Sequence, residues 1–304
     1  MLPARISELL DPFLRPENAQ RLPPSASPSE PAVLSPAQLH RISTYIDILL
    51  RWNSRINLTA IRDPEEIVTR HFGESLFAAR ILFPGGIAAV VERKAAPRAT
   101  DSPAGLEARG GANAPGDADY RGHAYARDAD YRDDADARAD ADARADVDHR
   151  GRAALQGRVT AHKEIGASAP AIADLGSGAG FPGLPLKLWA PHIHLTLIES
   201  NHKKATFLRE VTRALTLTDV DIRNTRAETL TGLAFDVVTL RAVERFETIL
   251  PTAAALVAPA GTLALLIAVP QLTQARATLP DFSWSDPVPI PLSRNRVLVQ
   301  AQRP

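Results

Sequence analysis

The sequence predicts an α/β fold in which a mostly parallel sheet carries helices on both faces, behind an N-terminal helical cap. Three observations support this prediction. An apolar run, Ala171–Leu175, leads directly into a glycine-rich turn, as a buried strand does. From there on, short apolar runs alternate with helical patterns, and such alternation demands a mostly parallel sheet. Residues 36–79, in contrast, show helical spacing alone.

Composition restricts the class of protein. The chain has 304 residues, no cysteine and a formal net charge of zero. Without cysteine there are neither disulfides nor thiolate zinc sites. There is no run of 18 apolar residues and no signal peptide in Met1–Glu8, so we expect a cytoplasmic enzyme with no membrane span and no metal. Zero net charge argues against a general nucleic-acid coat but allows local basic patches.

Four segments follow from composition shifts along the chain. Residues 1–35 hold a short amphipathic helix, Arg5–Leu14, and a linker rich in Pro and Ser. Residues 36–91 form the helical cap, and residues 166–304 the α/β domain. Between them, residues 92–165 consist mainly of Ala, Asp, Arg and Gly, which cannot bury enough apolar surface to offset chain entropy. We therefore expect a disordered insertion. The Asp-x-Asp repeats in it do not predict a calcium site, because no complete calcium loop is present.

The helical cap begins at a capping box. Ser35 lies three residues before Gln38, with Pro36 at the first helical position, so a helix should run to about Asn53. A second box, Asp63–Glu66, should open another helix. The expected buried positions are Leu39, Ile42, Ile46, Leu49 and Leu50 in the first helix, and Ile67, Val68, Phe72, Leu76 and Ala79 in the second.

The α/β domain is expected to begin with the strand 171–175. The following strands are predicted at 194–199, 219–223, 235–240 and 262–267, with helices at 184–189, 203–215 and near 246–257. Segments around Trp284 and at 296–300 resemble closing antiparallel strands. Leu208, Val211 and Leu215 should face inward.

The glycine-rich turn and a later acid indicate a ligand. The pattern is Asp174-x-Gly176-x-Gly178-x-Gly180, and Glu199 ends the next strand, at a spacing suited to hold ribose hydroxyls. A dinucleotide fingerprint is also present at 178–183, but it starts late and contains Pro182, which lacks an N–H for pyrophosphate. The turn resembles the first motif of the Rossmann-like class I S-adenosylmethionine methyltransferases.

Further stretches resemble one family closely: the bacterial small-subunit (16S) ribosomal RNA guanine-N7 methyltransferases, also called glucose-inhibited division protein B. The resemblance covers roughly residues 36–91 and 168–300. It is carried by residues 52–61 (WNSRINLTAI), 65–76 (EEIVTRHFGESL), 174–186 (DLGSGAGFPGLPL), 199–209 (ESNHKKATFLR), 226–228 (RAE) and 235–242 (FDVVTLRA).

The resemblance implies a binding site for S-adenosylmethionine. Gly176 and Phe181 would line the methionine end, and Glu199 would hold the ribose. Ala227 and Glu228 would border the adenine, and Arg241 would lie beside the cofactor and the entering base. Two positions depart from the family pattern: Leu240 replaces a usual Ser, and residues 265–269 replace a usual Lys-Gly pair.

The chemistry implied by the sequence agrees with transfer to guanine N7. Transfer to C5 of a pyrimidine usually needs a cysteine, and this chain has none. Transfer to an exocyclic amine commonly uses an Asn/Asp-Pro-Pro-aromatic loop, but residues 240–243 read Leu-Arg-Ala-Val. N7 needs alignment and no deprotonation, so no catalytic residue is assigned. The alternatives are a non-catalytic RNA-binding assembly factor with this fold and, more distantly, a nicotinamide dehydrogenase.

The expected partner is 16S ribosomal RNA or the small ribosomal subunit. Basic side chains that could meet phosphates are Arg51, Arg55, Arg62, Arg70, His71, Lys203, Lys204 and Arg209. Each could equally belong to an ordinary solvated helix face, and His71 could be a core histidine.

Overall fold

The computed structural model describes residues 1–15, 33–84, 86, 169–242 and 246–304. All of them belong to one unit formed by Met1–Lys94 and Arg158–Pro304. A second unit, Ala95–Gly157, and the whole insertion predicted at 92–165 lie outside the described residues.

Helices form the N-terminal part, as expected. These are α1 (Pro3–Leu14), α2 (Pro36–Asn53), α3 (Pro64–Glu66), the π-helical turn η3 (Ile67–Gly73) and α4 (Glu74–Leu82). The capping box predicted at Ser35 is complete, since the Ser35 side chain accepts from Gln38 N and the Gln38 side chain accepts from Ser35 N. At Asp63 one of the two predicted bonds is present: the Asp63 side chain accepts from Glu66 N. The single helix predicted after Asp63 is wrong in detail, because η3 divides it.

The remaining elements alternate. They are β1 (Ala171–Leu175), α7 (Gly183–Trp189), β2 (His194–Ile198), α8 (His202–Ala214), β3 (Val220–Arg223), the 3-10 turn η5 (Ala227–Thr229), β4 (Phe235–Arg241), α9 (Phe246–Ala255), β5 (Val257–Ala268), α10 (Val269–Thr278), β6 (Ser283–Trp284), β7 (Val288–Pro289) and β8 (Arg296–Gln302). Helix α10 and strand β7 were not expected, and β5 begins five residues before its predicted start.

The sheet confirms the predicted fold class. Its order is β3-β2-β1-β4-β5-β8-β6, and β7 also pairs with β8. Strands β1 to β5 pair in parallel, and β8 closes the sheet antiparallel to β5. The strand order reverses between β1 and β4, where open α/β sheets bind their ligands beyond the carboxyl ends of the strands.

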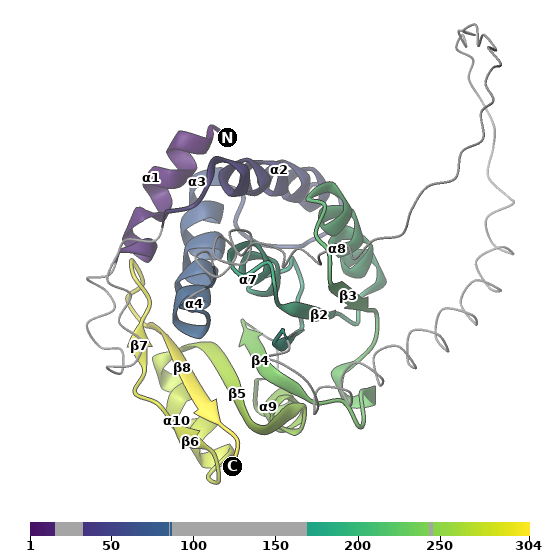
Figure 1. The fold of residues 1–304 in the computed structure, drawn as a ribbon, viewed down its shortest axis with the longest axis vertical. Helices are drawn as coiled ribbons and strands as arrows, with labels where there is room; N and C mark the ends of the chain where they lie inside the picture. Colours follow the sequence, from purple (N-terminus) through teal and green to yellow (C-terminus); the bar gives the residue numbers. More distant parts are fainter. Residues whose placement is uncertain (16–32, 85, 87–168, 243–245) are drawn as a thin grey trace, which may run out of the picture. The chain divides into compact units, whose positions relative to one another are not determined.

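Two hydrophobic cores cover the two faces of the sheet. Alternate residues of one strand belong to different cores: Ile172 packs with α1, α2, α4, α7 and α8, whereas Ala171 and Ala173 pack with α9 and α10. In Figure 1 the helices α2 and α4 each lie beside the purple helix α1, while α9 and α10 lie with the later strands. Leu208, Val211 and Leu215 are buried as predicted.

Candidate functional site

A pocket of about 860 Å³ lies beyond the carboxyl ends of β1, β2, β3 and β4. Its walls come from the turns that follow these strands, the segment between α2 and α3, the turn η3, and the starts of α8 and α9. The lining residues are Asn57, Leu58, Thr59, Ala60, His71, Gly176, Ser177, Gly178, Ala179, Phe181, Ile198, Glu199, Ser200, Lys204, Thr225, Arg226, Ala227, Glu228, Arg241, Ala242, Thr248 and Ile249.

The glycine-rich turn needs its glycines for two different reasons. Gly176, Gly178 and Gly180 all have positive φ, from +55° to +86°, which favours glycine. A Cβ on Gly180 would also collide with the hydroxyl of the buried Tyr45, so this position cannot carry a side chain. A Cβ on Gly178 would meet only Gly176 O, at 3.6 Å, and would enter open space. Gly178 also lines the pocket, so its bare backbone borders the space that a ligand would enter.

Asp174 supports the turn from beneath. Its carboxylate accepts hydrogen bonds from Thr239 Oγ1 at 2.8 Å and from Gly183 N at 3.2 Å. The side chain is fully buried, and burial raises the pKa of Asp174 to about 6. Asp174 does not line the pocket, so its part in the motif is to fix the turn and the start of α7.

Glu199 presents a buried carboxylate at the pocket wall. Its Oε2 accepts from Gly178 N at 2.9 Å and its Oε1 accepts from Asn201 N at 2.7 Å. A carboxylate offers about four lone-pair positions, so each oxygen can accept a further hydrogen bond from a ligand hydroxyl. Asn224 Nδ2 donates to the Glu199 carbonyl at 2.9 Å and thereby fixes the residue's backbone.

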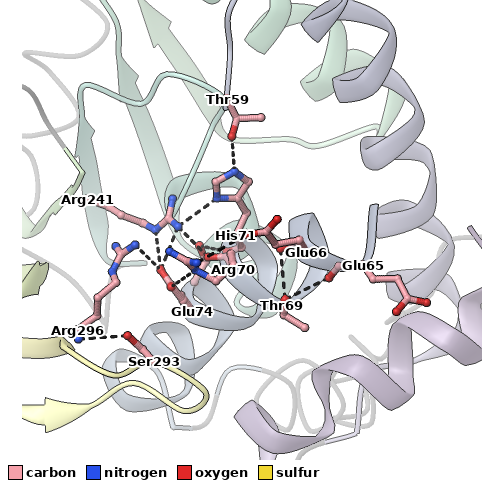
Figure 2. Close-up of polar contacts among 11 residues, drawn as sticks. Thr59, Glu65, Glu66, Thr69, Arg70, His71, Glu74, Arg241, Ser293 and Arg296 are labelled. Atoms are coloured by element: carbon pink, nitrogen blue, oxygen red, sulfur yellow. Dashed lines mark hydrogen bonds and ion pairs between the residues drawn. The ribbon is translucent and has the colours of Figure 1, made fainter. Parts of the chain in front are cut away.

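A cluster of three arginines around one carboxylate lies beside the pocket (Figure 2). The side chain of Glu74 is 1% exposed and lies within ion-pair distance of Arg241 (3.0 Å), Arg296 (3.2 Å) and Arg70 (3.4 Å). Burial lowers the pKa of Arg296, partly opposed by Glu74. Arg70 also pairs with Glu66 at 3.7 Å, so three guanidinium groups face two carboxylates and the cluster keeps a net positive charge beside the pocket.

His71 connects Arg241 of this cluster to Thr59, in the segment between α2 and α3. Its ring stacks on Phe181 with centroids 4.8 Å apart. Its Nδ1 lies 3.1 Å from Arg241 Nη2, and its Nε2 lies 2.8 Å from Thr59 Oγ1. Burial, followed by the charge of Arg241, lowers the pKa of His71 to about 3, so the ring is neutral near pH 7. His71 is thus a buried, hydrogen-bonded histidine at the pocket, and its contact with RNA stays a prediction.

All six residues predicted for the cofactor, namely Gly176, Phe181, Glu199, Ala227, Glu228 and Arg241, line this one pocket. The candidate RNA contacts are scattered. Lys204 and His71 line the pocket, Arg70 belongs to the arginine cluster, and Arg51 pairs with Glu210 at 2.6 Å. Residues Arg55, Arg62, Lys203 and Arg209 are exposed outside the lining set.

Sequence reasoning assigned no role to the wall formed by residues 57–60, although these residues lie in a stretch that carries the resemblance. Hydrogen bonds join Thr59 to Asn53 and to His71, six and twelve positions away in the sequence, but residues of these types at these spacings form no motif that predicts a pocket wall. Within the described residues there is no group of three His, Cys, Asp or Glu side chains that could hold a metal. Among the same residues, no helix is long and apolar enough to cross a membrane.

Comparison with known proteins gives a consistent family. The family described as "GidB: rRNA small subunit methyltransferase G" matches residues 38–88 and 155–284, and leaves the stretch between them unmatched. The chain is 30% identical over 243 residues to ribosomal RNA small subunit methyltransferase G of Halorhodospira halophila, covering 80% of this chain and 75% of that protein.

Two further relatives carry the same description. The protein of Xylella fastidiosa strain 9a5c is 30% identical over 220 residues, covering 72% of this chain and 64% of that protein. The protein of Mycoplasma capricolum is 50% identical over 97 residues, covering 31% of this chain and 42% of that protein.

Proposed function

The chain belongs to the family of ribosomal RNA small subunit methyltransferase G, and from that premise we propose that it transfers the methyl group of S-adenosylmethionine to N7 of a guanine in 16S ribosomal RNA. The observation that carries this proposal is the single pocket in which the glycine-rich turn, Glu199 and Arg241 meet. A substrate in the small ribosomal subunit implies action in the cytoplasm.

The residues of the pocket fit the cofactor. Gly176 and Gly178 offer bare backbone to the methionine part, and each oxygen of Glu199 keeps acceptor capacity for the ribose hydroxyls. Ala227 and Glu228, on η5, border the adenine part. When bound, the cofactor supplies an electrophilic methyl group on a sulfonium centre.

The described pocket favours an acceptor atom that needs no deprotonation. The imidazole of His71, the obvious candidate for a general base, has both nitrogens engaged and a strongly lowered pKa. N7 of guanine carries an in-plane lone pair and requires only alignment with the methyl group. Alignment of this kind can supply about 7–11 kcal/mol of barrier reduction.

The two departures from the family pattern lie away from this pocket. Leu240 is fully buried in the core beneath α9 and α10 and does not line the pocket. Leu265 belongs to the same core, Leu266 to the other one, and Ala268 precedes α10. The alternative of a non-catalytic assembly factor rested on these two departures alone, so it has no support left.

The test is methylation of small ribosomal subunits, and of deproteinised 16S RNA, by the purified protein with radiolabelled S-adenosylmethionine. Reduction followed by aniline treatment, which cleaves RNA at N7-methylguanine, should cut at one site. Label on an exocyclic amine or on a pyrimidine carbon would contradict the proposal. The single-turnover rate should be nearly flat from pH 7 to 9, since no catalytic proton transfer is required.

A further inference from the structure

Thr59 is held rigidly at the edge of the pocket. The buried Asn53 accepts from Leu58 N at 2.9 Å and from Thr59 N at 3.0 Å through its Oδ1. Its Nδ2 donates to the Thr59 carbonyl at 2.9 Å. Three hydrogen bonds to one side chain, two of them with Thr59, therefore fix the backbone of Leu58 and Thr59. The half-buried Thr59 side chain lines the pocket.

The hydrogen bonds of His71 set the direction of the contact to Thr59. A guanidinium group can only donate, so Arg241 Nη2 donates to His71 Nδ1. In the neutral ring the other nitrogen then carries the hydrogen, and His71 Nε2 donates to Thr59 Oγ1 at 2.8 Å. Figure 2 shows these contacts running from Arg241 through His71 to Thr59.

The Thr59 hydroxyl accepts a second hydrogen bond, from Ile61 N at 3.1 Å. A hydroxyl has two acceptor lone pairs and one hydrogen, so both acceptor positions are used. Among the described residues, no acceptor takes the hydroxyl hydrogen. Thr59 is thereby converted from a group that can donate or accept into one that can only donate.

The location of Thr59 matches the acceptor base better than the cofactor. The predicted ribose residue, Glu199, follows β2, whereas Arg241 ends β4, and these strands flank β1 on opposite sides. Thr59 joins the Arg241 side through His71. The pocket volume is near the upper end of the range of about 300–1,000 Å³ for small-molecule sites, which leaves space for a base beside the cofactor.

We propose that Thr59 donates its hydroxyl hydrogen to O6 of the target guanine and so selects guanine among purines. This inference rests on the proposed function. Guanine presents two neighbouring acceptors on one edge, N7 and O6, whereas adenine presents N7 and an amino donor. A group that can only donate binds O6 and thereby aligns the neighbouring N7 with the methyl group. When the base carries a 6-amino group in place of O6, two donors face each other and the contact is unfavourable.

The test varies the base and the side chain together. Small-subunit RNA is prepared with guanine, inosine or 2,6-diaminopurine at the methylated position. Inosine keeps O6 and loses the 2-amino group, whereas 2,6-diaminopurine replaces O6 with an amino group. Rates are divided by those of chemical methylation with dimethyl sulfate, which corrects for the intrinsic reactivity of each N7.

The wild-type protein should methylate inosine within about threefold of guanine and 2,6-diaminopurine at least about tenfold more slowly, as loss of one hydrogen bond with an unpaired partner implies. This arm requires no variant. Equal rates on all three bases, or slow reaction of inosine, would overturn the inference.

Thr59→Val should lower the rate on guanine about tenfold and leave the rate on 2,6-diaminopurine unchanged or higher, because the donor that faces the 6-amino group is removed, so the preference collapses. Thr59→Ser keeps the hydroxyl and should keep the preference. Calorimetry should give the same S-adenosylmethionine affinity for all three proteins. Loss of affinity in Thr59→Val with the preference intact would assign the hydroxyl to the cofactor and overturn the inference.

The two proposals fail in different ways. If the wild-type protein does not methylate guanine N7, the proposed function fails and this inference fails with it. If the wild-type protein does so normally and Thr59→Val keeps the preference for guanine, the inference alone is wrong.

Discussion

Glu199 and Arg241 are fixed by protein contacts before any ligand arrives. Glu199 accepts two backbone hydrogen bonds, and Arg241 is held by Glu74, the Arg70 carbonyl and His71. A group held in place in this way does not lose side-chain freedom when it binds a ligand, so its hydrogen bonds contribute more fully to affinity.

Glu199→Gln should weaken S-adenosylmethionine binding. The substitution keeps the shape but removes the charge and one acceptor, and hydrogen bonds to charged groups contribute about 1.5–3 kcal/mol, or about 10- to 150-fold in affinity. Calorimetry measures the change. Asp281→Asn is the matched control, because Asp281 is exposed and does not line the pocket. Unchanged affinity in a folded Glu199→Gln protein would refute the ribose assignment.

His71 should not titrate between pH 5 and 8. Its folded pKa of about 3 lies below the ordinary value of 6.5, so its contribution to stability is present above pH 6.5 and is lost as pH falls toward 3. The pKa of Asp174 is raised to about 6, so the contribution of Asp174 to stability increases as pH falls from about 6 to 4. A curve of stability against pH would therefore combine the opposite effects of the two residues. NMR of the imidazole resolves His71 directly, and a midpoint near 6.5 would contradict its buried, neutral state.

Among single residues, the sequence brought six proposed cofactor contacts to one pocket but assigned no role to Thr59. Glycines and an acid at a fixed spacing leave a local signature, and all six residues assigned from it and from the resemblance line the pocket. The role of Thr59 depends on hydrogen bonds from Ile61 and His71, and thus on Arg241, 182 positions away in the sequence from Thr59. Only the folded chain brings these groups together.

The elements that sequence analysis misplaced have weak or interrupted patterns. Helix α10 buries only Ala275, so it lacks an apolar stripe. Strand β5 starts at Val257 and includes Pro259 and Gly261, two residue types that are typical of turns. The strand tolerates them because its pairing with β4 is irregular at this point. The π-helical turn η3 keeps nearly helical spacing, so periodicity alone could not separate it from α4.

The glycine-rich turn predicts opposite outcomes for two neighbouring substitutions. Gly180→Ala should strongly destabilise the fold, because its methyl group meets the hydroxyl of Tyr45 and lies 2.7 Å from Leu184 Cδ1 in addition to the positive φ. Gly178→Ala should cost only about 1–2 kcal/mol of backbone strain, yet lose cofactor affinity because the methyl group enters the pocket.

Thermal unfolding measures the stability of both glycine variants, and calorimetry measures their affinity for S-adenosylmethionine. The two substitutions are chemically identical and two residues apart, so each is the control for the other. A stable Gly180→Ala protein, or full cofactor affinity in Gly178→Ala, would show that the turn does not shape the pocket as described.

For the molecule as a whole, the described chain is anchored on both sides of the stretch that the family pattern does not include. Gly86 lies against Trp189, whose Nε1 donates to the Phe83 carbonyl at 3.0 Å. At the other side, the Pro170 carbonyl accepts from His194 N at 2.9 Å. The chain is thus held by contacts within the described fold at Gly86 and at Pro170, on either side of this stretch.

Deleting residues 98–152 should therefore leave cofactor affinity unchanged and raise thermal stability slightly. The deleted sequence is rich in Asp, Arg, Ala and Gly and offers few groups for a core. Shortening the chain between Gly86 and Ala169 to about a third reduces the entropy cost of bringing these points together by about 1 kcal/mol, equivalent to about 2–4 °C in melting temperature. A deletion protein that unfolds would show that this stretch contributes to the fold. One that binds S-adenosylmethionine normally but no longer methylates small subunits would show that the stretch recruits the RNA.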